Sequence, residues 1–414
     1  MGHLEVLKSP LVNKLIKSFK DSDDHKKAEV SSWERIPADG KELPLIFGID
    51  GSLQPIEKDS PPYKKLAFVK TALVRIDQYA LSEIDKDFPH PLALRDLLTD
   101  SALHHATVFP LRNMSIPGKS LYDGVRQIIF ESMKDSLDGE PLETLKWIVY
   151  EKWSDRRRPL ALFDCPHCEE REARLPYNAE TGYCPGCEGE LFVTDMLGFH
   201  LEMTENSAPE IVAKSYMNIH EALLMFTGIR HYWTTNKEYL TNCLFVKDGP
   251  LYFYSQYLKL VNPIRRFLAF ARDEGYAVHI IGQEKSGKFY DHLELVGRAA
   301  PSNSLYILDN NYIRNEIRQK PSFITPYGKD TNYGAKVFVK LNNYHRMILN
   351  IPTGEFVANP SINNLIGAKR IFTTIPTIIS SRYEGALLPI ELAHGIASLS
   401  TYPSAEILKI FAGI

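Results

Sequence analysis

Two Cys-x-x-Cys pairs in the middle of this 414-residue chain constrain its fold more than any other feature. The pairs are Cys165-Pro-His-Cys168 and Cys184-Pro-Gly-Cys187, and 15 residues separate them. That separation is at the edge of the spacing expected of a four-cysteine zinc site, in which each pair supplies two thiolates to one ion. Pro166, Pro185 and Gly186 are residue types that favour the tight turns of such sites. The sequence therefore predicts a closed structural zinc site without an open position for catalysis.

Two disulfide bonds and a thioredoxin-like redox pair are the alternatives for these cysteines. A redox pair, or one disulfide, would need only one Cys-x-x-Cys pair, whereas this chain carries two matched pairs. Because four cysteines already complete a tetrahedron, we expect His167 to be a bystander inside the first pair. The arginines nearby could face DNA, face a partner protein, or form a solvated basic edge. They are Arg156, Arg157, Arg158, Arg171 and Arg174.

The overall charge gives the chain no general attraction to nucleic acid. It carries 48 basic and 51 acidic side chains, for a formal net charge of −3, so any DNA-binding surface must be a local patch. With 414 residues and 44% apolar composition, the chain is long enough for two or three domains. No signal peptide is visible, and the apolar runs fall far short of the roughly 20 residues of a membrane span. We expect a cytoplasmic protein with reduced cysteines and no membrane segment.

The spacing of apolar residues predicts an α/β fold, because helical patterns precede strands in the second half of the chain. The expected strands lie at 43–49, 66–76, 243–246, 277–281, 305–308, 337–341 and 346–350. The expected helices lie at 91–145, 209–226, 264–273 and, as the final helix, 389–398. We divide the chain into an N-terminal helix and linker (1–42), the first part of a core (43–160), the zinc-ribbon insertion (161–195) and the second part of the core (196–414).

Two apolar strands are each expected to end in an aspartate followed by glycine. Asp50 closes Leu-Ile-Phe-Gly-Ile, and Asp248 closes Cys-Leu-Phe-Val-Lys. Carboxylates at strand ends can hold the Mg²⁺ or Mn²⁺ ions that phosphodiester cleavage needs, and glycine lets a metal or phosphate come close. One Asp-Gly is weak evidence, because that dipeptide is a standard hairpin turn. The two together are stronger, since the residues that follow do not continue an alternating hairpin.

These stretches, Gly-Ile-Asp50-Gly-Ser52 and Phe-Val-Lys-Asp248-Gly-Pro-Leu, resemble motifs of the NurA nuclease family. The resemblance extends from about Leu43 to the C-terminus and implies an RNase H-like mixed sheet flanked by helices, with catalytic Mn²⁺ or Mg²⁺. It also implies a third acid on the helix before the second Asp strand, where Glu221 lies 27 residues before Asp248. Glu210 shares that helix, but an acid in the first turn is expected merely to complement the helix dipole. The ribbon insertion and the long segment between Asp50 and Glu221 depart from the family pattern and leave substrate choice and partner geometry open.

The same resemblance assigns two further residues to the site. His394, on a helix with a proline-rich approach, would be a metal ligand, a phosphate contact or a proton-transfer group. Lys285, just past a strand end, would neutralise the scissile phosphate, and a solvated loop lysine is the alternative. Asp309 also follows a strand, but the asparagines after it fit a turn equally well, so we leave it out. Because neighbouring carboxylates repel each other, at least one pKa in the acidic cluster should be raised, and activity should fall in mild acid.

Members of the NurA family generally act as dimers beside a hexameric HerA-type ATPase that translocates DNA. By resemblance, we expect a homodimeric DNA nuclease that works with such an ATPase in DNA end processing or in defence against foreign DNA. The chain has no Gly-x-x-x-x-Gly-Lys-Ser/Thr loop, so a separate translocating partner is chemically sensible. One alternative is a catalytically inactive adaptor that binds nucleic acid through the zinc ribbon. Another is an RNA-directed RNase H-like enzyme, which would differ only in its substrate groove.

An aromatic group follows the second Asp-Gly. Its members could stack unpaired bases, although alternating aromatics are first of all a sign of strand packing. They are Tyr252, Phe253, Tyr254 and Tyr257.

Overall fold

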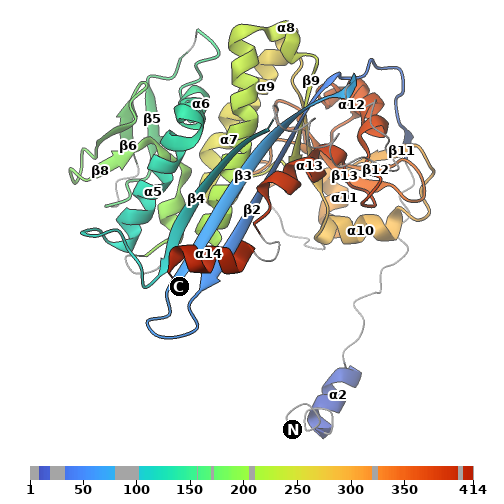
Figure 1. The fold of residues 1–414 in the computed structure, drawn as a ribbon. Coiled ribbons are helices and arrows are strands. Elements are labelled where there is room, and N and C mark those ends of the chain that lie inside the picture. Colours follow the sequence, from blue (N-terminus) through green and yellow to red (C-terminus); the bar gives the residue numbers. More distant parts are fainter. Residues whose placement is uncertain are drawn as a thin grey trace.

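The computed structural model describes residues 9–18, 33–79, 102–155, 157–168, 172–204, 210–318, 325–399 and 404–413. Within these residues, one large sheet contains β1 (Glu34–Arg35), β2 (Leu45–Glu57), β3 (Lys65–Asp77), β4 (Ala102–Arg112), β9 (Cys243–Asp248), β10 (His279–Glu284), β11 (Ser304–Ile307), β12 (Ala335–Lys340) and β13 (Arg346–Ile351). Their order across the sheet is β1-β11-β12-β13-β10-β9-β2-β3-β4. β2 and β10 run parallel to β9, whereas the other pairs are antiparallel. The expected α/β class with a mixed sheet flanked by helices is confirmed (Figure 1).

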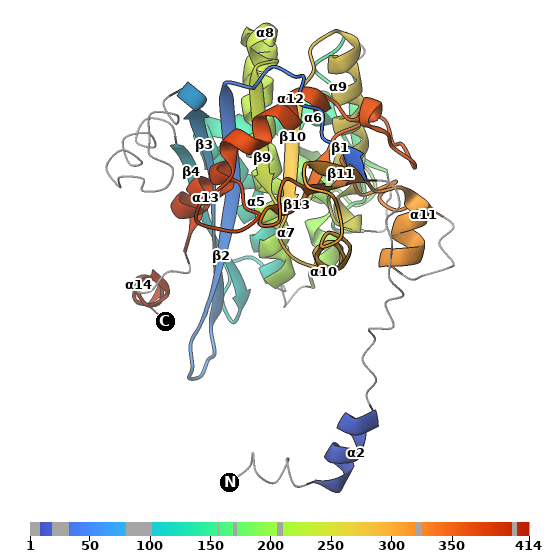
Figure 2. The ribbon, with the colours of Figure 1, turned by 90° about the vertical axis from the view of Figure 1, so that its right-hand side faces the viewer.

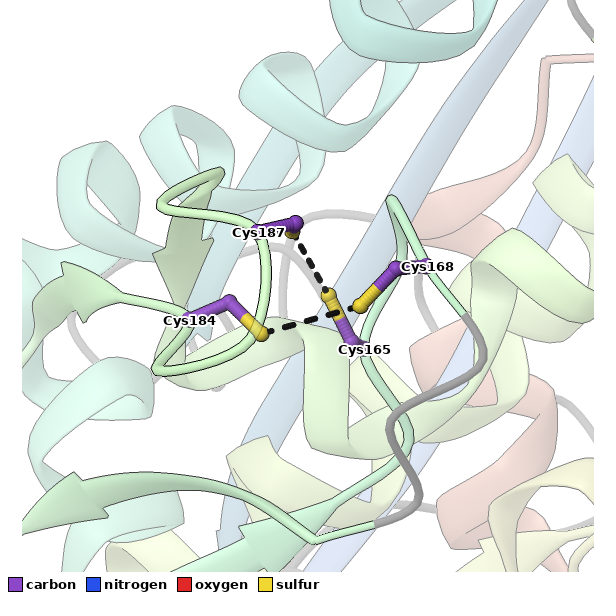
Figure 3. Close-up of side chains that lie close together, drawn as sticks. All are labelled: Cys165, Cys168, Cys184 and Cys187. Atoms are coloured by element: carbon purple, nitrogen blue, oxygen red, sulfur yellow. Dashed lines mark hydrogen bonds between the residues drawn. The ribbon is translucent and has the colours of Figure 1, made fainter.

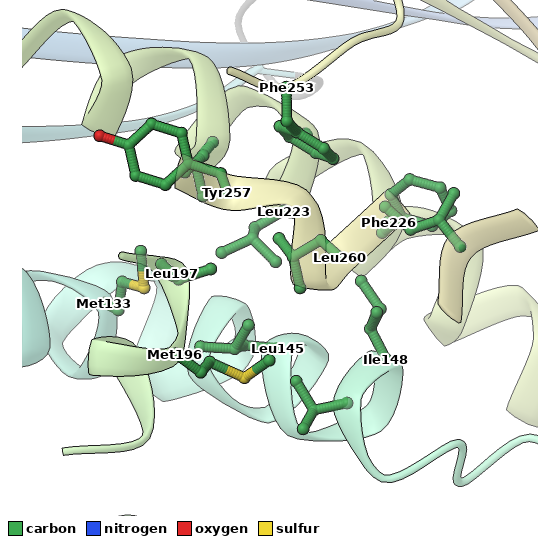
Figure 4. Close-up of a cluster of buried hydrophobic side chains, with 14 of the residues drawn as sticks. Met133, Leu145, Ile148, Met196, Leu197, Leu223, Phe226, Phe253, Tyr257 and Leu260 are labelled. Carbon is green, nitrogen blue, oxygen red and sulfur yellow. The ribbon is translucent and has the colours of Figure 1, made fainter. Parts of the chain in front are cut away.

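Helices cover both faces of this sheet (Figures 1 and 2). One face carries α5 (Leu121–Asp135), α6 (Glu140–Val149), α7 (Glu210–Thr235) and α9 (Val261–Asp273), and the other carries α12 (Ala368–Thr374) and α13 (Leu388–Ala397). The other α-helices of the described residues are α2 (Pro10–Ser18), α8 (Lys237–Leu240), α10 (Lys288–Val296), α11 (Asn310–Tyr312) and α14 (Ser404–Ala412). Figure 4 shows part of the larger core, where Met133 of α5, Leu145 of α6 and Leu223 of α7 come together.

Strand residues alternate between the two cores, because both faces of the sheet are covered. In β2, Phe47 and Ile49 belong to the larger core beneath α7, whereas Ile46 belongs to the second core beneath α13. Gly48 lies on the α13 side, where a Cβ would be only 2.1 Å from the main-chain oxygen of Pro389. Glycine at this position therefore lets α13 rest directly on β2.

The cysteine segment forms two small antiparallel sheets. β5 (Leu160–Phe163) pairs with β6 (Ala173–Pro176), and β7 (Thr181–Tyr183) pairs with β8 (Glu190–Phe192). Cys165, Cys184 and Leu191 belong to the same buried cluster as the residues of α5 and α7. This segment therefore packs into the larger core, while the division of the chain into four parts stays a prediction.

Three expectations about secondary structure are wrong. Residues 91–145 are not all helical: 91–101 lie outside the described residues, and β4 occupies Ala102–Arg112 because that stretch pairs with β3. Asp50 does not end a strand, since β2 continues to Glu57 and pairs along its whole length with β3 in a long hairpin. The helix expected at 389–398 is not the last, because α14 follows it.

The N-terminal helix is only partly described. α2 lies apart from the sheet in both views, and none of its residues is buried. The expected helix began at the N-terminus, but residues 1–8 and the linker residues 19–32 lie outside the described part. Among the helices that the structure describes, none has both the length and the apolar character needed to cross a membrane.

Candidate active site and metal centre

The parallel pairing of β2 with β9 brings two aspartates to the same level of the sheet. Ile49 pairs with Lys247 in this register, so the next residues are Asp50 on one strand and Asp248 on the other. β9 ends at Asp248, whereas β2 continues beyond Asp50. The two carboxylates therefore border the space beyond the end of β9, where ligands commonly bind in α/β sheets.

Asp50 is buried and held from two directions. Its Oδ1 accepts a hydrogen bond of 2.8 Å from the Gly51 backbone N–H, and its Oδ2 lies 2.8 Å from Nδ1 of His394 on α13. Burial raises the pKa of Asp50 to about 6, and the negative charge of Asp248 adds to the rise. The carboxyl group therefore lies in an environment with too little positive charge to offset its desolvation.

Glu221 approaches from the opposite face of the sheet, on α7. Its Oε1 lies so close to Gly51 that a Cβ added to the glycine would be only 2.5 Å from this oxygen. Its Oε2 lies 2.6 Å from Nζ of Lys247. Glycine after Asp50 is thus required by the approach of the glutamate, not by a turn. Burial raises the pKa of Glu221 to about 7; Lys247 opposes that rise, and the charges of Asp50 and Asp248 add to it.

The third acid, Asp248, has a basic partner of its own. Its Oδ1 lies 3.0 Å from Nζ of Lys285, whose side chain is 41% exposed. Each acid is thus paired with a different basic side chain: Asp50 with His394, Glu221 with Lys247, and Asp248 with Lys285. Lys247 was not among the predicted site residues. A lysine in the apolar run Cys-Leu-Phe-Val-Lys is nevertheless a signal, because a lysine is almost never fully buried unless it is paired.

The three acids, Lys247 and Lys285 line a cleft of about 1180 Å³, whereas His394 is not among its lining residues. Eight Lys and Arg residues and five Asp and Glu residues line it, so the cleft is locally basic although the chain carries a formal charge of −3. Tyr252 and Tyr254 also line the cleft, but they follow β9 rather than forming a strand. Tyr257 is 1% exposed and packs in the larger core, so the expectation that it could stack bases is wrong.

The four cysteines form a candidate metal centre (Figure 3). Their sulfurs all lie within 4.8 Å of one another, and the Cys165–Cys187 and Cys168–Cys184 Sγ distances are both 3.8 Å. With Zn–S bonds of about 2.3 Å, a regular tetrahedron puts its sulfurs about 3.8 Å apart. The cluster could therefore hold a metal ion such as zinc. Among the described residues, it is the one group of three or more His, Cys, Asp or Glu with the proximity of a ligand set.

The two cysteine turns share one backbone pattern and are anchored to α5. The N–H of His167 donates to Sγ of Cys165, and the N–H of Gly186 donates to Sγ of Cys184. The ring of His167 instead faces Arg126, with 3.1 Å between Nε2 and Nη1, and takes no part in the cysteine cluster. Arg126 in turn forms a buried bidentate pair with Asp195, which fixes the cysteine segment against the helix.

Two of the arginines near the cysteines have partners within the chain. Arg158 pairs with Glu151 at 2.7 Å, and Arg157 lies over the ring of Tyr177, whereas Arg156 and Arg171 fall outside the described residues.

Two acids that we set aside occupy local structural positions. Glu210 lies in the first turn of α7 and pairs with Lys65 at 3.1 Å. Asp309 caps α11 by accepting a hydrogen bond from the N–H of Tyr312. Both contacts fit the local roles expected for such residues.

Comparisons with models of known protein families and with curated proteins found no match to this chain. A function must therefore be inferred from the geometry of the cleft and of the cysteine cluster.

Proposed function

We propose that this chain is a divalent-metal-dependent DNA nuclease of the NurA kind. The observation that carries the proposal is that three acids from separate elements line one basic cleft, although they are not as close together as the cysteine cluster. Asp50 comes from β2, Glu221 from α7 and Asp248 from β9, and the charges of all three act on one another. A locally basic cleft with an acidic centre suits a phosphodiester substrate, because the rim binds phosphates and the centre binds cations.

The donor set suits Mn²⁺ or Mg²⁺. Carboxylate oxygens are the ligands that these hard cations prefer, and Asp50, Glu221 and Asp248 would hold them. The raised pKa values of Asp50 and Glu221 support this assignment, because they mark carboxyl groups that an added cation would stabilise in the charged form. When bound, such a cation supplies a Lewis acid that activates water and stabilises the leaving oxygen of the phosphodiester.

The basic side chains of the site have separate tasks. His394 orients Asp50, because its Nδ1 fixes the Oδ2 of that carboxylate. Lys285 reaches both Asp248 and the open cleft, so its exposed ammonium can neutralise a phosphate oxygen of the substrate. Further from the acids, the cleft offers cations for the phosphates of a nucleic-acid strand. They are Lys214, Lys288, Arg314, Arg318 and Lys329.

We extend the proposal to the setting that the motif resemblance implies. The chain would act as a homodimer beside a HerA-type hexameric translocase, in DNA end processing or in defence against foreign DNA. Zinc would fill the cysteine cluster as a structural ion. Co-purification with such an ATPase tests this setting, and a chain that degrades long duplexes while remaining alone would contradict it.

The nuclease proposal is tested by incubating the purified chain with labelled single-stranded DNA, duplex DNA and RNA, each with Mn²⁺ or with a chelator. We expect loss of full-length DNA only when Mn²⁺ or Mg²⁺ is present. Preferential loss of RNA would favour the RNase H-like alternative. DNA binding without any cleavage, unaffected by the chelator, would overturn the nuclease proposal in favour of an inactive adaptor.

A further inference from the structure

Lys247 is a buried cation with no task in the proposed reaction. Its side chain is 2% exposed, and it lies on β9 directly before Asp248. Its Nζ lies 2.6 Å from Oε2 of Glu221, 3.1 Å from Oδ1 of Asn218 and 2.9 Å from the main-chain oxygen of Asp248. A lysine ammonium has three N–H donors, so these acceptors use all of them. Lys247 is therefore committed to the protein and has no donor left for a substrate.

The alternation of β9 explains where this lysine points. Cys243 and Phe245 of β9 belong to the larger core beneath α7, and Lys247 continues the same series. Its partners Asn218 and Glu221 are three residues apart, which places them on the same side of α7. One ammonium thus connects β9 to one side of α7 and restrains both the helix and the Glu221 side chain.

The two oxygens of Glu221 have different surroundings. Oε2 accepts from Lys247, whereas Oε1 lies against Gly51, the residue that follows Asp50. A buried carboxylate without the lysine would lose its strongest restraint and could leave this orientation. The lysine therefore fixes the orientation of the Glu221 carboxylate, with one oxygen on Lys247 and the other toward the strand that carries Asp50.

We infer that Lys247 is a positioning residue, which holds the Glu221 carboxylate ready to take up the cation. This inference rests on the proposed nuclease function, because it assigns Glu221 to the metal. Lys247 acts through Glu221 and does not contact the substrate. Partners that orient a metal ligand in this way typically contribute about 10-fold to 100-fold to metal affinity.

The same cleft contains a matched control. Lys336 is also almost fully buried, with 3% of its side chain exposed, and it bonds Glu284 and Asn350. It lines the cleft, as Lys247 does, but its acidic partner is not one of the three proposed ligands. Lys336→Met therefore removes the same charge and the same kind of buried ion pair without touching Glu221.

The experiment measures Mn²⁺ affinity by calorimetry for the wild type, Lys247→Met, Glu221→Gln, the double variant and Lys336→Met. We expect Lys247→Met to weaken Mn²⁺ binding by about tenfold or more, and Lys336→Met to change it by less than about threefold. The double variant should bind no more weakly than Glu221→Gln alone, because a residue that acts through Glu221 has nothing to act on in its absence. Circular dichroism and thermal unfolding establish that each variant is folded.

A folded Lys247→Met variant with wild-type Mn²⁺ affinity, or a loss that adds fully to that of Glu221→Gln, would overturn the inference and leave the nuclease proposal standing. A wild type that binds no Mn²⁺ would overturn both. If Lys247→Met does not fold, Asn218→Ala replaces it, since it removes one acceptor of Lys247 and keeps the charge. We then expect Asn218→Ala alone to weaken Mn²⁺ binding. Added to Glu221→Gln, it should cause no further loss of affinity. Unchanged binding in Asn218→Ala alone would overturn the inference.

Discussion

His394 of α13 and Asp50 of β2 are 344 residues apart in the chain, yet their Nδ1 and Oδ2 atoms lie 2.8 Å apart. The contact depends on Gly48, where the lack of a side chain lets α13 rest on β2 two residues before the acid. The C-terminal part of the chain thus orients a carboxylate that the N-terminal part supplies. In the proposed nuclease, this coupling makes the helix a component of the active site.

Loss of the His394 ring should therefore slow catalysis. We expect His394→Ala to lower the rate of single-turnover DNA cleavage by about 10-fold to 100-fold, since one oxygen of Asp50 loses its partner. Gly395→Ala is the neighbouring control, because a Cβ there meets nothing within 4 Å. A wild-type cleavage rate in His394→Ala would show that the contact has no part in the reaction.

Gly51 should tolerate no side chain. An alanine Cβ would lie 2.5 Å from Oε1 of Glu221 and 2.7 Å from Cγ of Met217. We expect Gly51→Ala to lower the free energy of unfolding by about 1–3 kcal/mol, as overpacking does, and to weaken Mn²⁺ binding because Glu221 must move. Gly395→Ala in α13 should instead be neutral or stabilising by up to about 1 kcal/mol. Chemical denaturation of both variants measures the difference, and equal stabilities would contradict the account.

The contribution of the Asp50 and Glu221 carboxyls to the stability of the metal-free protein should fall as the pH rises from about 4 to about 7. The pKa values of Asp50 and Glu221 are raised to about 6 and about 7 from ordinary values of 3.8 and 4.5. Between these limits the two carboxyls bind more protons in the folded state than in the unfolded state, so their contribution to stability falls as the pH rises.

Asp50→Asn removes one of these two titrating carboxyl groups. It should therefore stabilise the metal-free protein at pH 8 by on the order of 2 kcal/mol and have little effect at pH 4. Denaturant unfolding in a chelator at both pH values measures this difference. Metal binding should have the opposite pH dependence. Mn²⁺ affinity and the rate of cleavage should both rise from about pH 5.5 to about pH 8, because the carboxyls must lose protons to bind a cation. Identical pH dependence of stability in the wild type and Asp50→Asn would contradict the assigned pKa of Asp50.

The cysteine cluster should support more than its own segment. Cys165 and Cys184 belong to the larger core, so Cys168→Ser should release the ion and destabilise the protein by several kcal/mol. The fifth cysteine, Cys243, is buried in β9 outside the cluster and gives the control. We expect about one zinc per chain in the wild type and in Cys243→Ala, and none in Cys168→Ser, by elemental analysis. Unchanged thermal stability after loss of the ion would contradict this role.

Local patterns were sufficient to predict much of the sheet. The strand after Leu43 and the strand around Leu66–Ile76 could be predicted from apolar and β-branched runs, and their pairing follows from proximity in the chain. The four-cysteine cluster could be predicted because the two turns fix their own geometry. β4 could not be predicted, because its buried and exposed residues do not alternate regularly and its position depends on pairing with β3.

The candidate site depends on contacts that no local pattern contains. The two Asp-Gly dipeptides indicated Asp50 and Asp248, but the close approach of Glu221 to Gly51 could not be predicted, because Glu221 lies on a distant helix. Lys247 could be recognised as unusual in an apolar strand, yet its partner emerges only when α7 packs against β9. The catalytic roles of Asp50, Glu221, Asp248, Lys285 and His394 stay predictions.

The most direct test of the nuclease account is Mn²⁺-dependent cleavage of labelled DNA by the wild type, Asp50→Asn and Asp248→Asn. Each substitution keeps the shape of the side chain and removes a charge that would hold the cation. The account predicts that the wild type degrades the DNA and that both variants, folded by circular dichroism, leave it intact. Cleavage by both folded variants at the wild-type rate would contradict the account.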